Sequence, residues 1–528
     1  CEISRRNAHS PKFNPGCVRV AAVRAYSSGA TATGGIYRKR GAKRSAMAGL
    51  SFMLQIVLAC VLVLLALLSA QLCMLALIRW FARPRKLAIA TVTPEELPHV
   101  LVQLPVCDEG FLAVRVAAAA ARLDWPRERL HIQVLDDGRA EHHAQLADAI
   151  AQAVPEGVDC VILRRGERVG FKAGNLAFGL KYSDAPFVAI FDADFVPPAD
   201  FLRRTIPVLM ADPGLSYVQA RWAHANRDRN WLTRVQGILL DSHFAVEQEA
   251  RFRAGLPMSF NGTAGVWARA AIDAGGGWTG DTLTEDLDLS MRCVMKGWRS
   301  ALLSDLEVPG ELPETASAWR AQQARWTKGH AQCARKLLPE IWTSGLSLRL
   351  KLLMTAQILQ FAFYLLAGAS VVVSLALMAM GVVYLKTVAA LGLAVTALGI
   401  LATVSYLYTG QIKLGRDGHP GLIRSLILAI IFPSGLVLAN TWATVEAVFN
   451  VRVDFVRTPK AGARATGGWR GGAEIAAGLM LPVFALAEQA SSVPFFLVAA
   501  AGLLSIGAMG WTDNRPAADH APSLPPAE

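Results

Sequence analysis

Two aspartates that stand two residues apart, Asp192 and Asp194, follow a short apolar run. Side chains two residues apart on an extended chain point to the same side. Carboxylate oxygens are the ligands that Mg²⁺ and Mn²⁺ prefer, and burying these acids beside Phe191 and Phe195 is costly without a cation. The pattern therefore predicts a site for Mg²⁺ or Mn²⁺ at Asp192 and Asp194, with the ion bridging a diphosphate.

Another acidic pair, Asp136 and Asp137, precedes Gly138 at the end of a second apolar run. Paired carboxylates at the end of a strand can hold a nucleoside or a metal-bound phosphate, because the backbone opens to a ligand there. Asp and Gly are also common in helix caps and turns. A structural role for this pair therefore stays open beside the binding role.

Glu285 and Asp286 form a third acidic pair, set between apolar residues in the sequence Leu-Thr-Glu-Asp-Leu. A carboxylate here can take the proton from an acceptor hydroxyl. The same residues suit the start of a helix, with Thr284 as the N-cap and the acids in the first turn. The two interpretations are compatible.

Gln322, Arg325 and Trp326 share one face of a predicted helix, because they stand at positions i, i+3 and i+4. An indole offers a flat surface to a sugar ring, and a guanidinium offers a fork to phosphate. Aromatic and basic anchors at a membrane surface are the alternative. Lys172 lies in a Gly-bearing loop, 170–175, that opens a helix and can cradle a phosphate.

Strands and helices alternate between about residues 95 and 310, which is typical of a doubly wound, mainly parallel sheet. Buried strands are predicted at 99–106, 130–135, 158–163 and 187–191, and helices at 111–122 and 141–153. In such sheets ligands bind at the carboxyl ends of the strands. The first two acidic pairs stand at strand ends of this kind.

Long apolar runs frame this α/β region. The runs at 50–78, 352–381, 387–409, 473–490 and 491–511 are long enough to cross a bilayer. The run 422–449 contains Asn440 and Glu446 and has basic residues on both sides, so it is predicted to lie at the membrane interface. This gives five crossings and a cytosolic catalytic domain.

The predicted domain layout has six parts. They are a disordered, targeting or extension segment (1–46), a membrane helix (47–86), the α/β domain (87–314), interfacial helices with the Gln-x-x-Arg-Trp motif (315–350), a membrane region (351–511) and a disordered tail (512–528). Apolar residues make up 53% of the chain, which agrees with a domain held between membrane segments.

The formal net charge of +12 is concentrated in the N-terminal tail and beside the apolar runs. A protein that binds nucleic acid would interleave basic clusters with aromatic residues. The charge is therefore attributed to membrane flanking, and nucleic acid is not expected as a partner. The eight cysteines form no C-x-x-C pair, which argues against a zinc site and favours unpaired thiols.

In their order along the chain, the motifs Asp-Asp-Gly, Asp-x-Asp, Thr-Glu-Asp and Gln-x-x-Arg-Trp resemble the processive branch of glycosyltransferase family 2. That branch includes cellulose, chitin, hyaluronan and mannan synthases. The mannan and glucomannan synthase group looks nearest, on the segments 102–105 (VQLP), 170–175 (GFKAGN), 260–265 (FNGTAG), 311–313 (ELP) and 455–460 (FVRTPK). The resemblance covers about residues 50–511 and implies a GT-A fold, an α/β Rossmann-like catalytic domain inserted between transmembrane helices.

The resemblance also implies a role for each matching residue. Asp286, with Glu285 beside it, would act as the catalytic base. The nucleotide sugar would be held by Glu109, Asp136, Asp137, Lys172 and Asp192, and the metal by Asp192 and Asp194. The acceptor and the leaving diphosphate would be held by Gln322, Arg325, Trp326, Gly262 and Thr263. Residues 455–460 match a gating loop, and Cys107 stands where the family usually has a tyrosine-led motif.

The implied function is inverting, processive polymerisation of a hexose from GDP-mannose, GDP-glucose or UDP-glucose into a β-linked polysaccharide that passes through the membrane. The implied partners are the nucleotide sugar, the growing glycan and membrane lipid, with accessory subunits left open. The implied location is a bacterial inner membrane or a Golgi membrane. The alternative is a lipid glucosyltransferase that transfers a single sugar to ceramide or diacylglycerol. A scaffold without activity and a transporter are the other classes considered.

Overall fold

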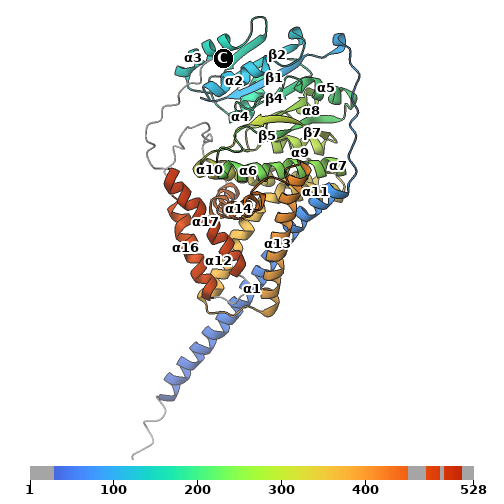
Figure 1. The fold of residues 1–528 in the computed structure, drawn as a ribbon. Coiled ribbons are helices and arrows are strands. Elements are labelled where there is room, and N and C mark those ends of the chain that lie inside the picture. The colour runs from blue at the N-terminus through green and yellow to red at the C-terminus, as the bar shows by residue number, and fades with distance from the viewer. Residues whose placement is uncertain (1–28, 450–470, 488–492, 514–528) are drawn as a thin grey trace, which may run out of the picture.

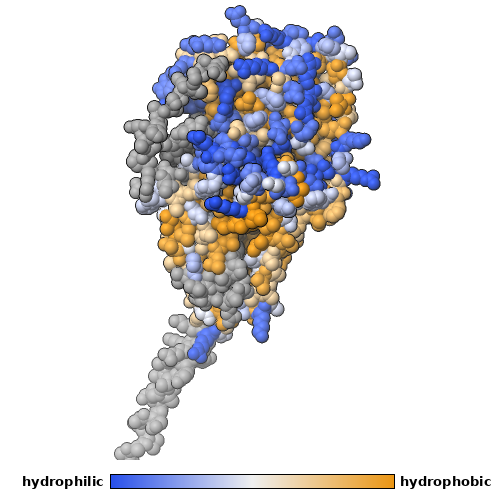
Figure 2. Space-filling view, in the orientation of Figure 1, coloured by the Kyte–Doolittle hydropathy of each residue, from blue (hydrophilic) through white to orange (hydrophobic). Residues whose placement is uncertain are grey.

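A computed structural model describes residues 29–449, 471–487 and 493–513. An α/β domain stands above a group of apolar helices (Figure 1). The surface of the domain is largely hydrophilic, whereas the surface of the helices below it is mainly hydrophobic (Figure 2). The structure confirms the predicted α/β domain flanked by apolar helices. The predicted gating loop, 455–460, lies outside the described residues.

The centre of the domain is a seven-stranded sheet with the order β3-β2-β1-β4-β6-β5-β7. The strands are β1 (Val100–Val106), β2 (Leu130–Asp136), β3 (Asp159–Arg164), β4 (Phe187–Ile190), β5 (Leu215–His224), β6 (Gly265–Ala268) and β7 (Arg299–Gly310). Six strands run in parallel, and β6 is antiparallel to both of its neighbours. The expected mainly parallel sheet is confirmed, and its first four strands lie within a residue or two of the predicted ranges.

Helices cover both faces of the sheet. Those of the domain are α2 (Phe111–Ala120), α3 (Ala140–Ala153), α4 (Phe171–Leu180), α5 (Phe201–Ala211), α6 (Trp231–Ser242), α7 (Glu249–Ala254), α8 (Arg269–Ala274) and α9 (Glu285–Met295), with a π-helical turn, η3 (His243–Gln248), and short 3₁₀ turns η1 (Pro94–Glu96) and η2 (Arg127–Arg129). One apolar cluster packs α2, α3 and α5 against the sheet. A second packs α4, α8 and α9 against the other face, which gives the doubly wound arrangement.

The remaining helices lie below the domain or join it to the apolar part. They are α1 (Gly29–Phe81), α10 (Ala316–Thr343), α11 (Leu348–Ile358), η4 (Leu359–Phe361), α12 (Ala362–Ala379), α13 (Lys386–Lys413), α14 (Leu422–Ser434), α15 (Val437–Val448), α16 (Gly472–Ala487) and α17 (Val493–Asp513). Three stretches, Arg44–Phe81, Leu348–Ala379 and Lys386–Lys413, are long and apolar enough to cross a membrane.

The predicted interfacial run, 422–449, forms two helices, α14 and α15, that are bent by 42° at a short break. Counted as one span, the pair would bring the candidate crossings to four among the described residues. The predicted crossings at 473–490 and 491–511 correspond to α16 and α17, whose described apolar parts are shorter. The count of five crossings and the domain layout therefore stay predictions.

Close packing of two glycines fixes the start of α4 against the loop before α9. Gly170 is the N-cap of α4 and has φ of +73°, a conformation that favours glycine. A Cβ on Gly280 would lie inside contact distance of the Gly170 backbone. These glycines bring Lys172, in the first turn of α4, near the acidic start of α9.

We expect Gly280→Ala to destabilise the domain by about 1–3 kcal/mol, because the added methyl forces two backbones apart. Thermal unfolding of the purified full chain would show this as a lower midpoint. Gly166→Ala is the control, since a Cβ at Gly166 meets nothing within 4 Å. Equal midpoints for the two variants would contradict the packing argument.

Candidate active site

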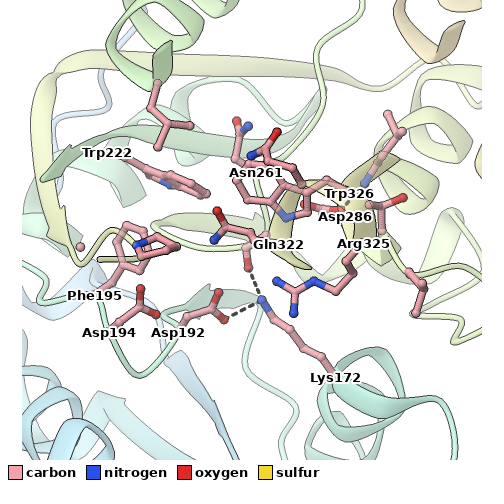
Figure 3. Close-up of a pocket in the computed structure, with 18 of the residues that line it drawn as sticks. Lys172, Asp192, Asp194, Phe195, Trp222, Asn261, Asp286, Gln322, Arg325 and Trp326 are labelled. Carbon is pink, nitrogen blue, oxygen red and sulfur yellow. Dashed lines mark hydrogen bonds and ion pairs between the residues drawn. The ribbon is translucent and has the colours of Figure 1, made fainter. Parts of the chain in front are cut away.

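A cavity of about 540 Å³ lies at the carboxyl ends of the central strands, between the sheet and α10. Its wall continues from the domain to residues of the apolar helices, including Gln357, Gln360, Tyr364 and Leu436. Figure 3 shows acidic, basic and aromatic side chains converging on this space. The position is the one that a doubly wound sheet offers to a ligand.

The cavity brings together most of the residues singled out in the sequence. Those that line it are Glu109, Asp137, Lys172, Asp192, Asp194, Gly262, Glu285, Asp286, Gln322, Arg325 and Trp326. Two candidates, Asp136 and Thr263, lie behind its wall and are buried. The Thr263 hydroxyl accepts a hydrogen bond from the backbone N–H of Asp192 at 2.9 Å, so it shapes the turn that carries the Asp-x-Asp motif.

Lys172 holds a central position in the cavity. Its Nζ atom lies 2.6 Å from Asp192 Oδ1 and 3.8 Å from Glu285 Oε1, and it donates to the Gly262 carbonyl at 2.8 Å. Burial alone would lower the pKa of this ammonium group. The neighbouring carboxylates of Asp192 and Glu285 raise the pKa by more than burial lowers it, so the net shift is upward. Lys172 is therefore a fixed positive charge next to the predicted metal site.

The carboxyl groups of Glu285 and Asp286 are partly buried in the first turn of α9. Burial raises the pKa of both groups, and it outweighs the lowering effect of Lys172 on each. The Leu287 backbone N–H donates to Asp286 Oδ1 at 2.8 Å. A carboxylate with a raised pKa in a cavity is suited to accept a proton.

The suggested capping role of Thr284 is only partly correct. Thr284 does occupy the N-cap position of α9, but its side chain makes no capping hydrogen bond. Its hydroxyl instead lies 3.3 Å from the Sγ atom of Cys333 on α10. The Thr284 side chain packs against α10 instead of capping α9. The contact is close, because a Cβ at Gly329 on α10 would meet the Thr284 side chain.

The long helix α10 carries Gln322, Arg325 and Trp326 across the mouth of the site. Figure 3 shows that Arg325 and Lys172 point into the same space, facing Asp192 and Gln322. Burial lowers the pKa of the Arg325 guanidinium, while Glu285 and Asp192 partly restore it. Two cations therefore meet across one cavity, as needed to hold an anionic group such as a diphosphate.

Asp192 and Asp194 place two carboxylates at the floor of the cavity (Figure 3). Among the described residues, no group of three or more His, Cys, Asp and Glu side chains is arranged to hold a metal ion. A divalent ion that keeps water or substrate phosphates as further ligands needs only one or two protein carboxylates. The pair therefore fits Mg²⁺ or Mn²⁺ bound together with a diphosphate.

The Asp-Asp-Gly pair is engaged by arginines. The Arg165 guanidinium makes a bidentate contact with Asp137, through Nε–Oδ1 at 2.7 Å and Nη2–Oδ2 at 2.6 Å. Asp136 Oδ2 lies 2.9 Å from Arg164 Nη1, and its Oδ1 atom accepts from the Gly138 backbone N–H. For Asp137 the structural role and the binding role both stay open, because its carboxylate is paired with Arg165 and also lines the cavity. The nucleoside role of Asp136 stays a prediction.

Several cavity residues had no signal in the sequence. Trp222, at the end of β5, packs against Phe195 with ring centroids 5.0 Å apart. His243 and Glu247 reach the cavity from η3, where His243 Nδ1 lies 3.1 Å from Glu247 Oε2. A π-helical turn shifts the helical periodicity, so spacing along the chain does not reveal which side chains face inward.

Comparisons with known proteins agree with this geometry. A model described as glycosyl transferase family 2 matches residues 102–271, and one described as glycosyl transferase family group 2 matches residues 187–406. Glucomannan 4-beta-mannosyltransferase 2 of Arabidopsis thaliana is 46% identical over 46% of this chain and 46% of its own length. A probable glucomannan 4-beta-mannosyltransferase 9 of Oryza sativa subsp. japonica is 43% identical over 47% of this chain and 48% of its own length. The matches thus span about half the length of these relatives.

Among solved structures, the mannosyltransferase PcManGT from Pyrobaculum calidifontis, in complex with GDP-Man and Mn²⁺, is 19% identical. The structural match covers 75% of this chain and 100% of the PcManGT chain, with a TM-score of 0.49. The α/β domain has the GT-A fold that the sequence motifs imply. On these two family matches, and on relatives that are 41–46% identical over about half of the chain, the part of the chain between residues 102 and 406 is a glycosyltransferase domain of family 2.

Proposed function

We propose that this chain is an inverting, processive β-glycosyltransferase that polymerises a hexose from a nucleotide sugar into a β-linked polysaccharide. The observation that carries the proposal is the single cavity in which two cations, two metal-type carboxylates and a partly buried acidic pair meet. The glucomannan mannosyltransferase relatives favour GDP-mannose and GDP-glucose as donors and a mannan or glucomannan as product. UDP-glucose and a β-glucan are the other combination that this site would suit.

The transfer step follows from the positions of the charged groups. Asp286 takes the proton from an acceptor hydroxyl as that oxygen forms a bond to the anomeric carbon. The bond from this carbon to the diphosphate oxygen breaks, and Lys172 and Arg325 stabilise the negative charge of the leaving diphosphate. Mg²⁺ or Mn²⁺ held by Asp192 and Asp194 would neutralise part of the diphosphate charge.

The acceptor end of the polymer would lie along α10 and the apolar helices. Trp326 and Gln322 line the cavity near the acidic pair, and Gln357, Gln360 and Tyr364 continue the wall into the apolar part. Aromatic faces and amide groups are suited to sugar rings and hydroxyls. This continuity supports a processive enzyme, because the product has a path away from the base that does not leave the protein. Basic residues at the domain ends of α1 and α13 favour a cytosolic catalytic domain in a multi-pass protein, whereas the basic stretch 38–44 at the other end of α1 counts against this orientation.

The test of the proposed function is sugar incorporation by membranes that contain the full chain. Labelled GDP-mannose, GDP-glucose and UDP-glucose are supplied separately with Mg²⁺ or Mn²⁺. The proposal predicts a water-insoluble or high-molecular-mass product that β-mannanase or β-glucanase digests. Label that is extracted wholly into organic solvent would identify a single-sugar lipid transferase and contradict polymerisation.

Two classes of carboxylate variant should separate binding from chemistry. Asp286→Asn should keep nucleotide binding but lower the rate of transfer by at least about 100-fold, because the base is lost. Asp194→Ala should instead weaken binding of the nucleotide in the presence of Mn²⁺, as should removal of the metal with EDTA. Binding is measured by calorimetry and transfer by label incorporation. Asp305→Asn, an exposed acid paired with Arg204, is the control. Near-normal transfer by Asp286→Asn would show that the base is another group.

The rate of transfer should depend on pH through the acidic pair. Because burial raises the pKa of Asp286, its carboxylate forms only at a pH above the range of an ordinary aspartate, about 3.9. The rate should therefore fall as the pH is lowered through the shifted pKa and rise above it. Measured rates at saturating donor between pH 5 and 8 test this, and a flat profile would argue against a base with a raised pKa.

A further inference from the structure

A second cavity, of about 250 Å³, lies where α6, the end of α13 and the start of α14 meet. It shares no lining residue with the active-site cavity. Its wall is made by Arg227, Asp228, Arg234, Ile238, Gln411, Arg416, His419, Leu422 and Ser425. The three arginines pair with only two aspartates, Asp228 on the wall and Asp241 beside it, so positive charge is in excess and the cavity is suited to an anion.

Asp241, which is fully buried on α6, positions two of these arginines. Its Oδ2 atom lies 2.6 Å from Arg416 Nη1 and also forms an ion pair with Arg227. Burial alone would raise the pKa of Asp241, but His224, whose Nε2 atom lies 3.4 Å from Asp241 Oδ1, and the charges of Arg227 and Arg416 lower it well below its usual value. An ionised Asp241 therefore holds the two guanidinium groups side by side at the junction of the domain and α13.

The fixed arginines keep donors for a ligand. A guanidinium has five N–H donors, and Arg416 directs one of its terminal nitrogens at Asp241. Arg234, whose side chain is 38% exposed, pairs with the exposed Asp228 at 3.1 Å on the rim of the cavity. A planar fork of donors recognises the oxygens of a phosphate group better than a single ammonium does.

The surroundings of the cavity are those of a membrane boundary. α13 is one of the three helices that are apolar and long enough to cross a membrane, and it ends at Lys413, just before the cavity. On α14, Ile423 and Ile427 are 76% and 52% exposed. α6 and α14 meet at the level where the hydrophilic surface of the domain gives way to the hydrophobic surface (Figures 1 and 2). A charged cavity thus borders an apolar surface.

We propose that this cavity binds the phosphate group of an anionic phospholipid whose acyl chains lie along α14. Basic pockets beside membrane helices are suited to such headgroups, and the exposed isoleucines would contact the chains. A soluble phosphate would use the arginines but would leave the apolar surface without a function. The proposal is independent of glycosyl transfer, because none of these residues lines the active-site cavity.

The test is native mass spectrometry of the detergent-solubilised full chain titrated with phosphatidylglycerol or phosphatidylcholine. The proposal predicts a specific complex with phosphatidylglycerol that forms at lower lipid concentration than the phosphatidylcholine complex. Arg234→Gln should weaken phosphatidylglycerol binding about five-fold, since one cation is lost. Asp228→Asn should strengthen it, because the negative charge that competes for Arg234 is removed.

Arg203→Gln is the matched control. Arg203 is 39% exposed and pairs with an exposed aspartate, Asp124, but it lies on α5, away from the cavity. Equal effects of Arg203→Gln and Arg234→Gln would show only general charge attraction and would overturn the proposal. Displacement of the lipid by millimolar inorganic phosphate would make the cavity a site for a free anion, which would also overturn the lipid assignment.

Discussion

The active site depends on several carboxylates that lie close together in one cavity and are balanced by two cations. The negative charge of Asp192 and the loss of solvent around Glu285 and Asp286 both raise the pKa of these two acids. Lys172 stands among them with Nζ at 2.6 Å from Asp192, and Arg325 faces them from α10. Such a cluster is stable only if cations and carboxylates are held at fixed positions, because removing one partner leaves an unpaired buried charge. The fold supplies that rigidity.

Each member of the cluster comes from a different element. Asp192 follows β4, Lys172 opens α4, Glu285 opens α9 and Arg325 lies in the middle of α10. The parallel strands bring the first of these to one edge of the sheet, while the contact of Gly170 with Gly280 sets α4 beside the loop before α9. The long helix α10 then closes the site and joins it to the apolar helices. The charge arrangement thus links the domain to the part of the chain suited to a membrane.

Much of the fold could be predicted from the sequence, because apolar runs of strand length alternate with helical segments between β1 and β4. β5 and β7 were missed, since polar residues such as Gln219 and Glu307 interrupt their apolar pattern. β6 was also missed: it is as short as β4, but it begins with Gly265 and runs directly into the Ala-rich sequence of α8. Its antiparallel direction depends on long-range pairing with β4 and β5, which local sequence does not encode.

The acidic motifs were found because carboxylates between apolar residues are costly without a function. Their grouping in one cavity follows from the sheet, but the position of Lys172 between Asp192 and Glu285 depends on tertiary contacts. Trp222 and Glu247 could not be found by spacing, since one ends a missed strand and the other lies on a π-helical turn. The ion pairs of Asp136 could not be predicted either, because His143 and Arg164 approach its carboxylate only in the folded domain.

The most direct test of the account is an experimental structure of the full chain with Mn²⁺ and a nucleoside diphosphate. The account predicts the diphosphate between Lys172 and Arg325, the ion on Asp192 and Asp194, and Asp286 open toward the acceptor side of the cavity. A diphosphate bound elsewhere on the domain, or an ion that avoids both aspartates, would contradict it.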